Sequence, residues 1–182
     1  MLLTEPRTGV LLALLVVAAV IDFRIYKIPN WLTLGGTAFA LIYSVFVPFS
    51  RDAGLLWALG GMLLGFAVML PMYALGVMGA GDVKLMAMVG AFLGLNDILL
   101  ALIFALIAGG VAALLVALFR KSLWRMVRNV KNVVQAATYA ALGGMKPQVF
   151  LDAGESVGKL PYGVSICAGT SVYLVAKQLG YA

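Results

Sequence analysis

The sequence predicts an all-α polytopic membrane protein with about six transmembrane helices and an additional amphipathic helix on the cytoplasmic face. Hydrophobic residues make up 64% of the chain and charged residues 11%, whereas soluble domains carry roughly 45–50% and about 25%. So few charged side chains cannot cover a water-soluble globule, and the surface must therefore face lipid. This composition excludes a cytosolic enzyme, a disordered tail and a secreted domain held together by disulfides.

Six apolar stretches are candidates for membrane-spanning helices, which need ~20 largely apolar residues each. In chain order they cover residues 9–21, 31–47, 55–77, 83–95, 98–119 and 161–175. The first can extend through Asp22 and Phe23. The third contains Pro71, where we expect a kink. The fourth is short for a complete crossing.

The distribution of basic residues predicts the orientation of these helices. With six crossings, ten Lys and Arg residues fall on one side of the membrane and three on the other. The ten are Arg24, Lys27, Lys84, Arg120, Lys121, Arg125, Arg128, Lys131, Lys146 and Lys159, and the three are Arg7, Arg51 and Lys177. The positive-inside rule places the first side in the cytoplasm and both termini outside. We therefore attribute the net charge of +6 to membrane topology and expect no nucleic-acid partner.

Residues 121–137 have the pattern of a basic amphipathic helix, within a cytoplasmic segment of about 120–160. Apolar residues recur at helical spacing on one face: Leu123, Val127, Val130, Val134 and Ala137. Polar residues recur on another: Lys121, Arg125, Arg128, Asn132 and Gln135. Such a helix is expected to lie flat on the anionic inner leaflet. The alternative is a helix that only tethers the mobile loop expected after it.

The chain lacks the residues on which several kinds of active site depend. Cys167 is the single cysteine and there is no histidine. An internal disulfide, the usual zinc and haem sites and a Ser-His-Asp triad are therefore excluded. We expect no metal and no cofactor.

Asp22 and Asp82 are the acidic residues expected at the cytoplasmic edges of apolar spans. Carboxylates at membrane depth are costly and mark functional sites. Each also has a simpler interpretation. Asp22 could be an interfacial residue paired with Arg24 or Lys27, and Asp82 could be the N-cap of a helix that begins at Val83.

The surroundings of the two aspartates favour a catalytic role. Gly79 and Gly81 allow the backbone close approach beside Asp82, and residues 28–30 (Ile-Pro-Asn) form a rigid turn after Asp22. The predicted topology places both carboxylates on one side at similar depth. Two carboxylates in one dry site hold a shared proton. One can then accept a proton from water while the other polarises a peptide carbonyl, as in an aspartyl protease.

Three motifs resemble those of the type IV prepilin peptidases, a GxGD class of intramembrane aspartyl protease. They are D-x(5)-I-P-N at residues 22–30, G-A-G-D-V-K at 79–84 and L-P-Y-G-V at 160–164. The resemblance implies that residues 1–182 form a single membrane-embedded prepilin peptidase domain with Asp22 and Asp82 as the catalytic pair. It also implies a bacterial cytoplasmic (inner) membrane protein that cleaves short basic leaders from prepilins or pseudopilins at the cytoplasmic face.

The chain departs from the larger members of this family between its first two spans. Only residues 23–31 lie there, without the cysteine-containing insert associated with zinc and N-methylation. The chain therefore resembles the short form found with Flp-type tight-adherence pili, and we expect no methyltransferase domain or activity.

Other motif residues are candidates for supporting the site. Gly79 and Gly81 present Asp82, Lys84 follows it, and Pro161, Tyr162 and Gly163 open the last helix beside it. Lys84 could equally be a topology charge, and Pro161 an ordinary helix start. The alternative functions are an ion- or proton-coupled transporter component that uses Asp22 and Asp82, and a non-catalytic scaffold subunit. The sequence leaves the oligomeric state open.

Overall fold

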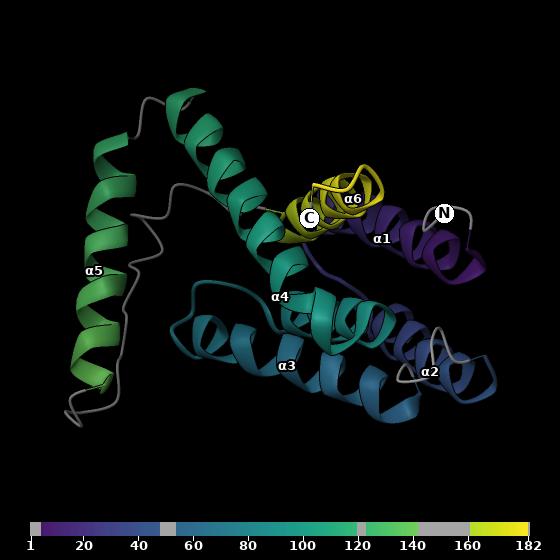
Figure 1. The fold of residues 1–182 in the computed structure, drawn as a ribbon. Coiled ribbons are helices and arrows are strands. Elements are labelled where there is room, and N and C mark those ends of the chain that lie inside the picture. The colour runs from purple at the N-terminus through teal and green to yellow at the C-terminus, as the bar shows by residue number, and fades with distance from the viewer. Residues whose placement is uncertain (1–4, 48–53, 120–122, 142–160, 182) are drawn as a thin grey trace.

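The computed structural model describes residues 5–47, 54–119, 123–141 and 161–181, and these are organised as helices (Figure 1). The helices are α1 (Pro6–Ile25), α2 (Asn30–Phe46), α3 (Leu55–Ala74), α4 (Ala80–Phe119), α5 (Leu123–Ala141) and α6 (Tyr162–Gln178). The prediction of a helical membrane protein is confirmed. The mobile loop expected before the last helix, and Arg51, Arg120, Lys121, Lys146 and Lys159, lie outside the described residues.

Three of the described helices are long and apolar enough to cross a membrane. They are α1, α3 and α4, and α2 is a shorter apolar helix of 17 residues. The predicted number of six crossings therefore stays a prediction. The predicted fourth and fifth spans lie in a single helical run of 40 residues, α4. At 1.5 Å per residue this run measures about 60 Å, or twice the thickness of a bilayer core.

Gly94 divides α4 into two segments. Its φ of 74° and ψ of −175° lie outside the helical region, in backbone space that residues with a side chain avoid. A Cβ at this position would also overlap the ring of Trp57 on α3. The break therefore occurs close to the predicted junction between residues 95 and 98. Asp97, three residues after the break, forms an ion pair with Lys177 of α6.

The helices pack around α4, which contacts every other helix in the described part of the chain. Its most extensive partners are α3 and α6, and α1 packs mainly on α6 (Figure 1). By contrast, α1 and α4 make little direct contact. Helix α5 stands apart from this bundle and contacts only α4 among the described helices.

Small residues bring the backbones of α3 and α4 together. A Cβ on Gly61 would overlap the carbonyl oxygen of Gly90, and one on Gly65 would lie 2.7 Å from that of Met86. Gly60, one residue away from Gly61, would make only an ordinary contact with Leu95, 3.5 Å away. The glycines of α3 therefore serve packing within the chain, as small residues commonly do between membrane helices.

Candidate functional site

Asp22 lies in the last turn of α1 and is buried, with 5% of its surface exposed. Its Oδ2 accepts a hydrogen bond of 2.7 Å from the backbone N–H of Gly163. Arg24 and Lys27, the partners considered from the sequence, have exposed side chains. The structure thus places Asp22 against the start of α6, 141 residues further along the chain.

Gly163 is the second residue of α6, so its N–H is one of the first-turn donors that have no partner within a helix. Pro161 precedes the helix with φ of −75° and ψ of 87° and provides no side-chain cap. The Asp22 carboxylate, which belongs to α1, caps the start of α6 instead. The positive end of the α6 dipole faces the charge of this carboxylate.

Asp82 lies in the first turn of α4 and is 7% exposed. Its Oδ2 accepts a hydrogen bond of 3.1 Å from the N–H of Gly79, and its own N–H donates to the Gly79 carbonyl oxygen, also at 3.1 Å. The alternative of an N-cap for a helix beginning at Val83 is wrong, because α4 begins at Ala80. The carboxylate reaches back to the residue before the helix, like the acidic member of a capping box.

The Asp22 and Asp82 carboxylates are close enough to interact electrostatically. Tyr162, at the start of α6, is close enough to Asp82 to interact with it as well. In the described part of the chain, each carboxylate receives a single hydrogen bond, to its Oδ2. Neither Oδ1 atom accepts a hydrogen bond from the described residues.

The glycines of the predicted motifs differ in how tightly they are enclosed. A Cβ on Gly163 would lie 2.9 Å from Asp22 Oδ2 and 3.0 Å from its Cβ. A Cβ on Gly81 would lie 3.2 Å from the Cβ of Ile28, so the Ile-Pro-Asn turn packs directly on the GxGD turn. A Cβ on Gly79 would make an ordinary contact with Asp82 at 3.4 Å. Gly163 is therefore the glycine in closest contact with a carboxylate, which its place in the motif did not indicate.

Lys84 contacts neither aspartate through a hydrogen bond. Its Nζ donates to Oδ1 of Asn30 at 2.9 Å, which joins α4 to the first residue of α2. Asn30 belongs to the D-x(5)-I-P-N motif but was not predicted as a site residue. Its position after Pro29 indicates only the start of a helix. Because the hydrogen bond with Lys84 spans 54 residues, the local sequence gives no signal for this contact.

The described residues contain no group of three or more His, Cys, Asp or Glu side chains that could hold a metal ion.

Residues 9–114 match a family model described as the type IV leader peptidase family. The matched range includes both aspartates and both glycines of the GxGD motif, and it ends before α6. Neither a curated protein nor a solved structure matches the chain.

Proposed function

Because the chain belongs to the type IV leader peptidase family, we propose that it is a membrane aspartyl endopeptidase. Its substrates in this proposal are type IV, Flp-like prepilins or pseudopilins, from which it removes the short basic leader peptide at the cytoplasmic face of the membrane. One observation supports the proposal: Asp22 and Asp82, 60 positions apart in the chain, are both buried and close enough to interact, and each accepts a hydrogen bond from a backbone N–H.

The arrangement can support hydrolysis of a peptide bond by general acid–base catalysis. Two interacting carboxylates share one proton, so one is an acid and the other a base. The ionised carboxylate accepts a proton from water as the water oxygen attacks the carbonyl carbon. The protonated carboxyl donates its proton to the carbonyl oxygen. Protonation of the amide nitrogen then allows the C–N bond to break, which leaves a carboxylic acid on the leader and a new amine on the pilin.

The backbone hydrogen bonds explain why the site needs glycines and helix starts rather than additional charged side chains. The N–H groups of Gly163 and Gly79 each occupy one oxygen of a carboxylate and so orient the other. Preorganised backbone donors of this kind require no rearrangement during the reaction. The Ile28–Gly81 contact and the Lys84–Asn30 hydrogen bond hold the α1–α2 connection against the start of α4, and so support the same geometry.

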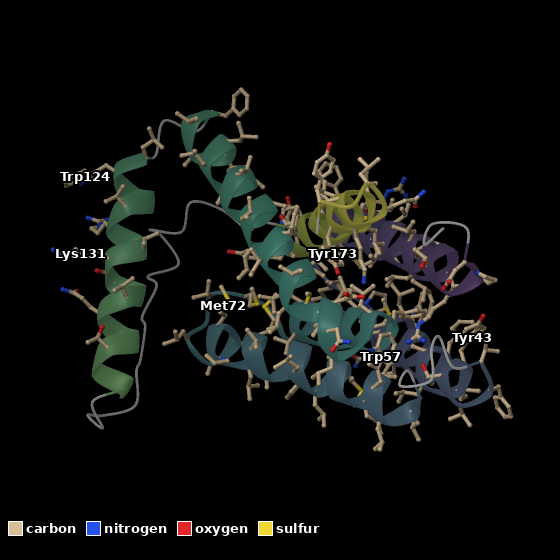
Figure 2. All side chains as sticks on the ribbon, viewed as in Figure 1. Tyr43, Trp57, Met72, Trp124, Lys131 and Tyr173 are labelled. Atoms are coloured by element: carbon tan, nitrogen blue, oxygen red, sulfur yellow. The ribbon has the colours of Figure 1, made fainter. Side chains whose placement is uncertain are left out.

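We further propose six crossings of the bacterial inner membrane, with both termini outside and the dyad toward the cytoplasm. The length of α4 and its break at Gly94 support two crossings by this run. In this topology α5 follows the apolar end of α4 after three residues, 120–122, and so begins near the membrane surface. Its exposed side chains include Trp124 and Lys131, which point away from the bundle (Figure 2). In this proposal α5 is the amphipathic helix, lying on the anionic leaflet.

The decisive test is processing of a co-expressed prepilin by single aspartate variants. Asp22→Asn and Asp82→Asn each remove an ionisable group but keep its shape, and each is expected to abolish leader removal while the protein remains in the membrane. Asp97→Asn is the matched control, because Asp97 pairs with Lys177 and lies outside the dyad. The readout is the mass of the pilin. Full processing by either dyad variant would contradict the aspartyl mechanism.

The same mass measurement tests the absence of methyltransferase activity. The connection between α1 and α2 comprises only residues 26–29, which leaves no room for an additional domain there. The expected product is a shortened pilin with an unmethylated N-terminus. A pilin of unchanged mass, together with ion flux that depends on both aspartates, would instead favour the transporter.

A further inference from the structure

Arg7 has an environment that its predicted place on the outer side of the membrane did not suggest. It lies in the first turn of α1 with 4% of its surface exposed. Its Nη2 donates a hydrogen bond of 2.6 Å to the carbonyl oxygen of Ala91 on α4. Its guanidinium also lies over the ring of Trp57 on α3, with Cζ 4.8 Å from the ring centroid. A buried arginine is costly, and it persists where its contacts are specific.

The acceptor of this hydrogen bond lies at the break in α4. The last four carbonyls before the end of a helical segment lack partners within that segment, and Ala91 is three residues before Gly94. Trp57 occupies the space where a side chain on Gly94 would lie. Arg7 therefore donates a hydrogen bond to a carbonyl beside the break in α4. The Trp57 ring, over which Arg7 lies, packs against Gly94.

This contact joins the two helices that carry the aspartates. Arg7 and Asp22 are both on α1, about 22 Å apart along the helix axis, and Ala91 and Asp82 are both on α4, about 14 Å apart. Direct contact between α1 and α4 is otherwise sparse. At one end of this pair of helices, α6 contacts α1 through the hydrogen bond from Gly163 to Asp22. At the other end, Arg7 connects α1 to α4.

We propose that Arg7 is a positioning residue, which fixes the placement of α1 relative to α4 and thereby the separation of the Asp22 and Asp82 carboxylates. The proposal rests on the proposed dyad. Lysine cannot replace arginine fully in this role, because a compact ammonium can donate to the carbonyl but lacks the planar group that arginine places over the indole ring. Methionine preserves much of the length of the side chain and removes both interactions.

The test measures the separation of the dyad positions without using activity. In a C167S background, D22C/D82C protein in membranes is treated with bifunctional thiol reagents of increasing spacer length. We expect R7M to shift crosslinking toward longer reagents, and R7K to lie between R7M and the parent. In parallel, R7M with both aspartates intact is expected to process prepilin about tenfold more slowly or worse, since small displacements of reacting groups cost up to ~10²-fold in rate.

A control cysteine pair shows that the variants are folded. A Cβ on Gly109 would lie 3.7 Å from the Cβ of Ser165, which suits a disulfide between α4 and α6. The G109C/S165C disulfide is expected in R7M and R7K alike. An unchanged crosslinking profile in R7M that retains this disulfide would overturn the proposal. If R7M does not form the disulfide, the crosslinking profile of R7K is used instead. An R7K profile equal to that of the parent would then overturn the proposal. Failure of the dyad itself would be seen separately, as processing by the Asp→Asn variants.

Discussion

Replacing Gly163 with alanine is expected to impair catalysis more than the conservative nature of the change suggests. The added Cβ would lie 2.9 Å from Asp22 Oδ2, so the start of α6 must retreat by about 0.5 Å to reach 3.4 Å, where ordinary contacts begin. The hydrogen bond, 2.7 Å in the parent, then lengthens to about 3.2 Å, the upper end of the normal range. A 1 Å misplacement can cost ~10²-fold, so half of that displacement is expected to cost about tenfold in kcat.

The change also has a cost in stability, which the assay must separate from the loss of rate. Overpacking a well-packed contact costs typically 1–3 kcal/mol. Processing of a prepilin in detergent or membranes, measured as a time course normalised to folded enzyme, gives the rate. Gly110→Ala is the matched control, because a Cβ there meets no atom within 4 Å. Parental kcat in G163A, with thermal stability equal to that of G110A, would refute the proposed role of the Gly163–Asp22 contact.

The enclosure of the three motif glycines predicts an order of sensitivity. Alanine at Gly81 is expected to have a smaller effect than at Gly163, because its closest neighbour is the Ile28 side chain at 3.2 Å rather than a carboxylate. Alanine at Gly79 is expected to be tolerated best, because its contact with Asp82 is of ordinary length. Rate measurements on the three variants would contradict this reasoning if G79A were the most impaired.

Two other contacts give predictions with internal controls. Gly61→Ala forces a Cβ into the Gly90 carbonyl and is expected to lower the free energy of unfolding by ~1–3 kcal/mol. Gly60→Ala should leave it almost unchanged in the same thermal or denaturant titration, and equal effects would contradict the packing described. Removing the Lys84–Asn30 hydrogen bond by K84M or N30A is expected to slow processing a few-fold, by ~1 kcal/mol or less. If the K84M/N30A double variant is no slower than either single variant, the two residues act through one interaction. Additive losses of rate would contradict this.

The sequence predicted the fold where hydrophobic periodicity and helix-breaking residues determine it. The expected spans at 31–47 and 161–175 agree with α2 and α6 to within a few residues. The break in α4 was expected a few residues later, at Asn96 and Asp97, because polar residues usually mark a connection. The structure places it at Gly94, where positive φ and the packing of Trp57 leave no space for a side chain.

The sequence was less informative about contacts between distant segments. Asp22 and Asp82 could be predicted as a pair from their common expected depth and from family motifs. The carboxylate contacts of Gly163 and the hydrogen bond between Lys84 and Asn30 depend on how helices pack, which no local pattern encodes. Arg7 was interpreted as a topology charge because the positive-inside rule counts charges and does not register burial.

Helix α6 links the two halves of the proposed active site, although it lies outside the residues matched by the family model. It packs against both α1 and α4, which otherwise touch little. Its first turn supplies the N–H that holds Asp22, and further along Gly169 lies against the backbone of α4 at Ala105. The spacing of the carboxylates therefore depends on how α6 fits between the two helices, in addition to the direct contact that Arg7 makes between them. This explains why the helix begins with a motif containing glycine: a side chain at Gly163 would separate the helix from the carboxylate that it holds.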